Sequence, residues 1–239
     1  MTARPPRRAL RLAVTAVAGV ACLVAAVVAG RAARAAQTRP PTAAELAAAV
    51  RTATAGRWRA WPEGRIFPAA LGYTTSLLTQ ERATRAGIAP GGGCAAGLTG
   101  AAVTAARRDG CLAVLRATYL DQLQGVVYTA GVVAFSSPAR AAAFERAAAH
   151  DRLPAGLRAF PLPGTGTARF TDAARQAETS RQAGPYVVFT VAGYADGRPA
   201  RAGDSRASVF APGRQLAAEV AGPLTVRPVV RCGTPEWTC

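Results

Sequence analysis

The residues able to do acid–base or nucleophilic chemistry are few and lie apart in the sequence. His150 is the single histidine, there is no lysine, and the 13 acidic residues are scattered. Ser136 and Ser137 precede the segment that ends at His150, but neither lies in a Gly-x-Ser-x-Gly nucleophile elbow. We therefore expect His150 to be a helix-end histidine, and chemistry that needs two histidines or a lysine within this chain is excluded.

Two further patterns fall short of a site. The run Gly91-Gly92-Gly93 is not followed by the Gly-Lys-Ser/Thr of a phosphate-binding loop. Asp109 and Asp121 flank one expected strand, and their separation of about 12 residues argues against a paired-carboxylate site. The sequence predicts no catalytic residue, no cofactor-binding residue and no metal ligand.

The cysteines indicate disulfide chemistry. Cys94, Cys111, Cys232 and Cys239 form an even set, as is typical of exported domains, and four cysteines allow three pairings. We favour Cys94–Cys111 and Cys232–Cys239, because the members of each pair are close in sequence. A zinc site is disfavoured because no Cys-x-x-Cys is present. Cys22, inside an apolar run, is expected to be a plain membrane residue.

A cluster of arginine and tryptophan is the most suggestive patch. Arg57, Trp58, Arg59 and Trp61 combine guanidinium groups, which pair with phosphate, and indole rings, which favour polar–apolar boundaries. This composition would suit binding to an anionic surface. The interpretation that we favour is more ordinary, namely that both rings cover the core where the chain enters its domain.

The elements that must position these residues begin with an apolar segment. Residues 12–30 carry no charge and are long enough to span about 30 Å of hydrocarbon, with arginines on both sides. The slight excess of positive charge before the segment favours a cytoplasmic N-terminus. We predict a basic cytoplasmic stretch 1–11, a transmembrane helix 12–30, a juxtamembrane spacer and helix 31–56, and an extracytoplasmic domain 57–239. The alternative is a signal peptide cleaved at the small-x-small sequence of residues 33–35.

The net charge of +16 divides between these parts. Residues 1–40 hold seven arginines and no acid, so nearly half of the charge flanks the apolar segment. The remaining +9 favours anionic neighbours such as headgroups or wall polymers, and it gives no reason to expect nucleic acid.

Hydrophobic periodicity and turn signals predict an α+β domain with an antiparallel sheet packed with helices. Strands are expected at 111–120 and 126–135, joined as a hairpin, and at 186–194. Helices are expected at 42–54, with a Thr42/Glu45 capping box, and at 74–86, 98–108 and 138–149. A helix from Asp204 is expected to be interrupted by Pro212-Gly213, and residues 170–181 fit either a helix or a strand.

A basic N-terminus, an alanine- and valine-rich anchor and a small cysteine-bearing domain resemble the uncharacterised single-pass membrane-anchored extracytoplasmic proteins of high-GC actinobacteria. The architecture of residues 57–239 is also similar to the extracellular sensor domains of actinobacterial receptor kinases. These resemblances carry over no functional residue.

The sequence thus favours a non-catalytic binding or assembly module anchored in the membrane through residues 12–30. Its expected partner is an envelope protein or an anionic polymer or headgroup. An extracytoplasmic hydrolase is the alternative.

Overall fold

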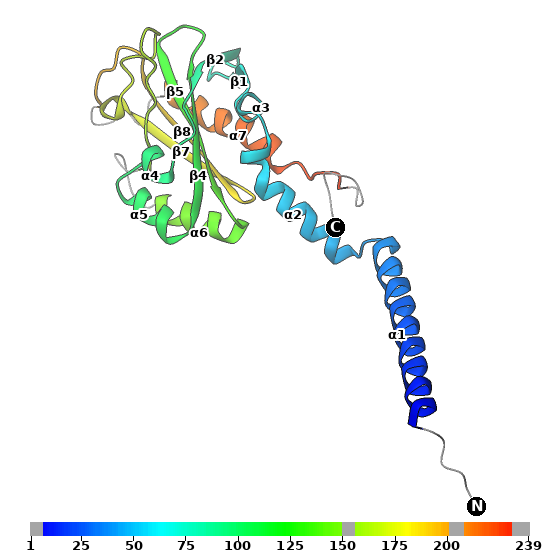
Figure 1. Cartoon of the computed structure of the whole chain (residues 1–239). Helices are drawn as coiled ribbons and strands as arrows, with labels where there is room; N and C mark the ends of the chain where they lie inside the picture. The colour runs from blue at the N-terminus through cyan, green and yellow to red at the C-terminus, as the bar shows by residue number, and fades with distance from the viewer. Residues whose placement is uncertain (1–6, 150–155, 201–207, 231–239) are drawn as a thin grey trace, which may run out of the picture. The chain divides into compact units, whose positions relative to one another are not determined.

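The computed structural model describes residues 7–149, 156–200 and 208–230 (Figure 1). The chain divides into two compact units, one of which runs Ala47–Arg231, while the other contains the long first helix. Cys232, Cys239 and His150 lie outside the described residues.

The first helix, α1 (Arg7–Thr38), includes an apolar window at Ala16–Ala35 with mean hydropathy 2.0. None of this window is buried, and it is long and apolar enough to cross a membrane. The helix continues past both ends of the predicted segment 12–30. Cys22 is a free, exposed thiol on it.

A capping box begins the second helix, α2 (Ala43–Ala60), as the sequence predicts. The amide of Glu45 donates to Thr42 Oγ1 (3.3 Å), and the amide of Thr42 donates to Glu45 Oε2 (2.8 Å). Arg39 pairs with the other carboxylate oxygen at 2.5 Å. The Arg39 side chain, with the amide and the hydroxyl of Thr42, which both donate to Glu45 Oε2 (2.8 and 2.9 Å), lowers the pKa of Glu45 to about 2.

The prediction that this helix ends at residue 54, within the segment 31–56, is wrong, because α2 continues through Gly56 to Ala60. Tertiary contacts explain the extension: the hydroxyl of Tyr186 donates to the carbonyl of Thr54 (2.6 Å) and accepts from the amide of Trp58 (3.4 Å). Pro62, which has no amide hydrogen, follows the last turn.

The second unit is built on a six-stranded antiparallel sheet with the order β1-β2-β4-β5-β8-β7. The strands are β1 (Ala70–Thr74), β2 (Gln80–Ile88), β4 (Cys111–Leu120), β5 (Val126–Phe135), β7 (Ala177–Ala183) and β8 (Tyr186–Tyr194). A two-stranded sheet pairs β3 (Leu98–Thr99) with β6 (Gly156–Leu157). The α+β class is confirmed, and β4, β5 and β8 have the predicted bounds.

Helices cover both faces of the sheet (Figure 1). The longer ones are α5 (Ala101–Arg108), α6 (Pro138–Ala149) and α7 (Pro212–Thr225), and the short ones are α3 (Glu63–Ile66), α4 (Cys94–Gly97), η1 (Asp172–Ala174) and η3 (Ser208–Phe210). Residues of α7 pack with one face, and residues of α5 and α6 pack with the other. All ten residues of β5 are consequently buried, whereas a sheet covered on one face would expose every second side chain.

The disulfide Cys94–Cys111 is present and joins the start of α4 to the start of β4. It closes the connection between the β1–β2 hairpin and the central β4–β5 hairpin. The pairing agrees with the short spacing on which the prediction rested.

One further prediction is wrong. Residues 74–86 form a turn and most of β2 rather than a helix, because β2 pairs with β1 on one side and with β4 on the other. The predicted start of a helix at Asp204 lies outside the described residues. Pro212 begins α7 at its first turn, where the missing amide hydrogen costs nothing. The ambiguous segment 170–181 resolves into η1 and the start of β7.

Candidate functional site

Arg57, from the predicted arginine–tryptophan cluster, is buried, with 5% of its surface exposed. Its Nη1 donates to the carbonyls of Pro223 (3.1 Å) and Leu224 (2.6 Å), and its Nη2 donates to the carbonyl of Val226. These carbonyls end α7 and have no partner within that helix. Arg57 therefore caps α7 and offers no donor to an anionic surface outside.

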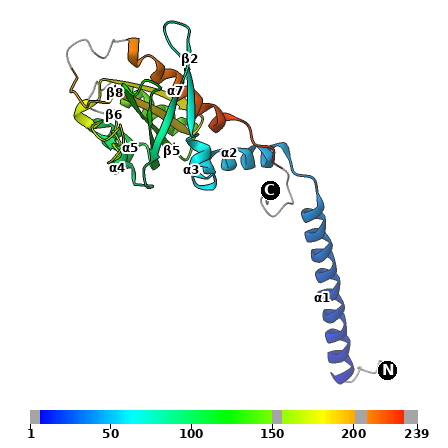
Figure 2. The same cartoon turned by 90° about the horizontal axis from the view of Figure 1, so that it is seen from above.

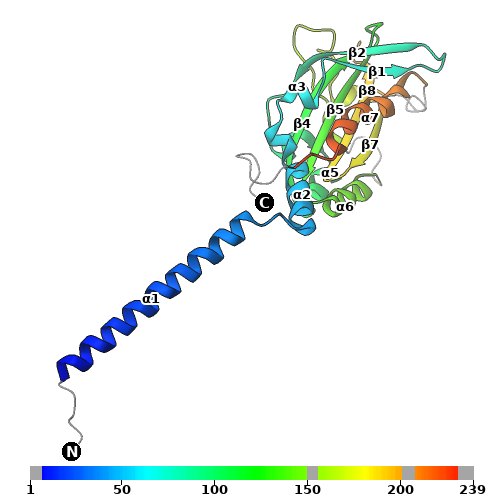
Figure 3. The same cartoon turned by 90° about the vertical axis from the view of Figure 1, so that its right-hand side faces the viewer.

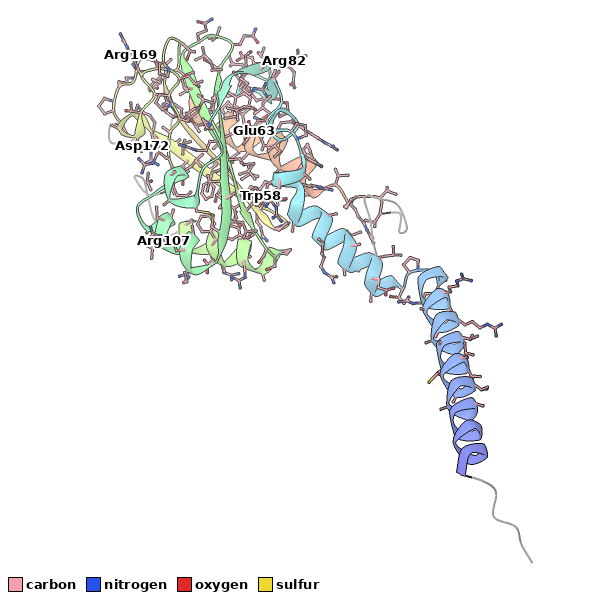
Figure 4. The ribbon with its side chains drawn as sticks, in the orientation of Figure 1. Trp58, Glu63, Arg82, Arg107, Arg169 and Asp172 are labelled. Atoms are coloured by element: carbon pink, nitrogen blue, oxygen red, sulfur yellow. A yellow bond between two sulfur atoms is a disulfide. The ribbon has the colours of Figure 1, made fainter. Side chains whose placement is uncertain are left out.

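The two tryptophan rings of the cluster are partly buried against the α7-side core. Figure 4 shows Trp58 where α2 meets the sheet. Arg59 lies 5.1 Å from the Trp58 ring centroid, and Arg65 of α3 lies 3.9 Å from that of Trp61. The exposed cations of this region are therefore Arg59 and Arg65, and the sequence analysis missed Arg65 because α3 brings it back over the ring.

A carboxylate that is 15% exposed lies on the other face. Glu178 accepts the amide of Leu157 (3.0 Å) and lies 4.0 Å from Arg175 Nη1, which donates to the Leu157 carbonyl (2.8 Å). Burial raises the pKa of Glu178 to about 7, and the Leu157 hydrogen bond and Arg175 oppose the rise. Shifted carboxylates often mark active sites. Here the two side chains clamp β6 by its backbone, so a structural role accounts for the pair.

A pocket of about 280 Å³ lies at the end of the sheet where the β1–β2 and β4–β5 turns meet. The strand register explains why the two turns lie close together. Thr84 of β2 pairs with Leu120, the last residue of β4, and β2 starts four residues before Thr84. The β1–β2 hairpin therefore extends past the β4–β5 turn, as Figures 2 and 3 show. The pocket is lined by Tyr73, Thr75, Ser76, Leu77, Thr79, Glu81, Asp121, Leu123, Val126, Tyr128, Ser208, Val209 and Pro212.

Two residues that line this pocket, Leu77 and Leu123, are exposed leucines, and a third exposed leucine, Leu78, follows Leu77 in the chain. Leu77 and Leu78 are each 85% exposed and Leu123 is 80% exposed, although leucine side chains ordinarily seek burial. A cluster of exposed apolar side chains with a polar surround is typical of a surface that binds a partner. We call these leucines and the pocket the hairpin-tip site.

The turns hold the leucines outward through their own hydrogen bonds. Thr75 Oγ1 accepts the amides of Leu77 (3.3 Å) and Thr79 (3.2 Å), and the amide of Thr75 donates to the Thr79 carbonyl (2.9 Å). Leu78 and Gln124 have φ of 62° and 57°, a left-handed conformation that non-glycine residues seldom adopt. Such backbone is retained where surrounding structure enforces it, often at binding sites.

Glu81 and Asp121 supply the charge of the pocket. Glu81 Oε2 accepts the hydroxyl of Tyr73 (2.7 Å), and Asp121 Oδ1 accepts the amide of Val126 (2.8 Å). Burial, the hydrogen bond to Glu81 and the charges of both carboxylates raise the pKa of Tyr73, which keeps its hydroxyl protonated as a donor. Within the described residues, neither carboxylate is paired with an arginine.

A second hollow of about 480 Å³ adjoins this end of the sheet and is lined in part by Arg82, Arg85 and Asp121. Arg85 is already engaged, because its Nη1 donates to the Phe67 carbonyl. Arg82, which Figure 4 labels on β2, is exposed. This hollow is more basic than the hairpin-tip site, because two of its described lining residues are arginines.

Among the described residues, neither Ser76 nor Ser208 is hydrogen-bonded to a histidine or a carboxylate, which a serine nucleophile requires. In the same part of the chain, no group of three or more histidine, cysteine or acidic side chains is arranged to hold a metal ion.

Comparison with known proteins adds no further constraint: no protein-family model, curated protein or solved structure matches the chain. The fold and the site together define the class only as an α+β domain that follows a helix able to span a membrane and carries a pocket at its hairpin tips.

The sequence analysis did not single out the hairpin-tip site, since the segment Thr75-Ser-Leu-Leu-Thr79 fell inside a predicted helix. One local signal was available. Threonines bracket two adjacent leucines, and threonine hydroxyls bond to the backbone of short turns. Leu123, between two glutamines in a predicted turn, was a second signal.

Proposed function

We propose that this protein is a non-catalytic binding module, held at the outer face of the cytoplasmic membrane by α1, which binds a protein partner at the hairpin-tip site. One observation carries the proposal: Leu77 and Leu123, which line the pocket from two adjacent turns, are 85% and 80% exposed, and Leu78 beside Leu77 is also 85% exposed. Leaving them in water forgoes about 1.5–3 kcal/mol for each side chain that a partner could bury.

Two features support the anchored, exported setting. The window Ala16–Ala35 suits a membrane span, and arginines flank it on both sides. The Cys94–Cys111 disulfide suits an oxidising compartment, since such bonds are uncommon in reducing cytosol.

An anionic envelope component is the second candidate partner, and the arginines stacked on the tryptophans favour it. Arg59 and Arg65 are exposed and held over ring faces, where a guanidinium can still pair with phosphate. This surface is separate in sequence from the hairpin-tip site, so each can be disabled alone.

Site-specific photocrosslinking in the native cells tests the proposed function. A benzoylphenylalanine at Leu77 or Leu123 should yield one discrete adduct with a protein. The same group at exposed Arg107, at the opposite end of the sheet from Arg82 (Figure 4), should not. Equal adducts at all three positions, or none at the tips, would contradict the proposal.

Fractionation tests the anchor. The full chain should remain with membranes in alkaline carbonate, and an impermeant thiol reagent applied after reduction should reach Cys94 and Cys111 in intact spheroplasts. Release by carbonate, or labelling only after lysis, would contradict the anchored or the exported setting respectively.

A further inference from the structure

The charge of the hairpin-tip site is opposite to that of the chain. Arginine outnumbers acidic residues by 29 to 13, yet among the described residues both charged side chains that line the pocket, Glu81 and Asp121, are acidic. Anionic headgroups and polymers, which the rest of the surface should attract, would be repelled here.

Both carboxylates also keep acceptor capacity. Glu81 uses Oε2 for Tyr73, and Asp121 uses Oδ1 for Val126. No described residue donates a hydrogen bond to Glu81 Oε1 or Asp121 Oδ2. A charged donor from outside could therefore bind without displacing the bonds that hold the pocket together.

The other residues that line the pocket indicate which groups of a ligand would lie beside its cation. Leu77 and Leu123 line the pocket beside the carboxylates, and the aromatic residues Tyr73 and Tyr128 line it as well. Apolar side chains would be buried against the leucines, while a cation would be attracted to the carboxylates.

Resting on the proposed function, we propose that the occupant is a segment of a partner protein that presents an arginine or lysine between apolar side chains. The cation enters between Glu81 and Asp121, and the flanking apolar groups cover Leu77 and Leu123. The turns need not rearrange, because their hydrogen bonds already hold the leucines outward.

A defined peptide pair tests this charge preference on the full chain in phosphatidylcholine nanodiscs. The probe is the capped, fluorescein-labelled peptide Gly-Ser-Leu-Arg-Leu-Ser-Gly, and its match carries citrulline, an uncharged isostere, in place of arginine. By fluorescence anisotropy, the arginine peptide should bind about fivefold more tightly than the citrulline peptide.

Matched variants locate the effect. Glu81→Gln and Asp121→Asn should each weaken binding of the arginine peptide about two- to fivefold and leave the citrulline peptide unaffected. Both amides retain the oxygen that accepts the structural hydrogen bond. Glu63→Gln, at an exposed acid outside the pocket, is the control and should change neither affinity.

A second pair tests the apolar part. Leu77→Ser should weaken both peptides, while Leu112→Ser, at a leucine 47% exposed on β4, should weaken neither.

The inference is overturned if the two peptides bind equally, if the arginine peptide shows no saturable binding up to about 5 mM, or if Glu63→Gln has the effect of Glu81→Gln. Peptide binding is also compared between phosphatidylcholine and phosphatidylglycerol nanodiscs. If phosphatidylglycerol abolishes peptide binding to the same extent in the parent and in the Glu81→Gln variant, the hairpin-tip site prefers lipid to the peptide and the inference is overturned. If a partner binds the hairpin-tip site through other chemistry, a protein adduct at Leu77 or Leu123 would still form after any of these results. The photocrosslinking experiment therefore tests the proposed function separately from this inference.

Discussion

Protonation of Glu178 should make the second unit more stable in mild acid than in mild base. The perturbation is the exchange Glu178→Gln, which removes the titrating group and keeps an oxygen that can accept the Leu157 amide. The groups that face the carboxylate are that amide and the Arg175 guanidinium, which remains charged throughout the range.

The sign follows from which state holds the proton more tightly. Burial raises the pKa of Glu178 from its ordinary 4.5 to about 7 in the folded protein. Below pH 4.5 both states are protonated, and the carboxyl group is neutral in each. Between pH 4.5 and 7 only the unfolded state loses the proton, so stability falls as pH rises, by about 1.4 kcal/mol per pH unit. The total loss is about 3 kcal/mol, complete above pH 7.

Urea unfolding of the full chain in a nonionic detergent, followed by tryptophan fluorescence, measures this. The free energy of unfolding of the parent minus that of Glu178→Gln should fall by about 3 kcal/mol between pH 4.5 and pH 8. Glu219→Gln, at an exposed acid on α7, is the matched control and should give a difference that changes little. A parent–variant difference that stays constant over this range would refute the reasoning.

Three other outcomes are expected. Arg57→Ala should lower the free energy of unfolding by about 3 kcal/mol, because it leaves the buried carbonyls at the end of α7 without a donor. An unchanged urea midpoint would show that water replaces the guanidinium. Replacing Cys94 and Cys111 together by alanine should cost roughly 3 kcal/mol in the same assay, and an equal loss on adding reductant to the parent would identify the disulfide as the cause. The double change Arg59→Gln and Arg65→Gln should leave the urea midpoint unchanged and weaken flotation with anionic but not zwitterionic liposomes, whereas unaltered flotation would remove the anionic partner from consideration.

The sequence predicted the central hairpin and β8 well because their residues satisfy two demands at once. Alternating apolar side chains favour strands, and β-branched valines fit strands that are covered on both faces. The helix 138–149 was equally clear, since Ser137-Pro138 is a strong start signal. In these elements local preference and tertiary environment agree.

The prediction failed where local and tertiary demands differ. Residues 74–86 contain enough helix-forming side chains to suggest a helix, but backbone pairing on both edges makes most of them a strand. Gly56 looked like a helix end, yet contacts with Tyr186 hold the helix together beyond it. No local pattern reports a hydrogen bond to a residue 132 positions away in the chain.

The sequence by itself determined the class of fold, a helix suited to a membrane, and the pairing of Cys94 with Cys111, because these depend on composition and short spacing. The tertiary structure alone decided the roles of the charged residues. Arg57 and Glu81 are both ordinary surface residue types in the sequence. The fold buries Arg57 against the end of α7 and brings Glu81 beside Asp121, forty residues later, in an acidic pocket on a basic chain. The physical reason is that a charge acts through its neighbours in space, and strand register rather than sequence order selects them.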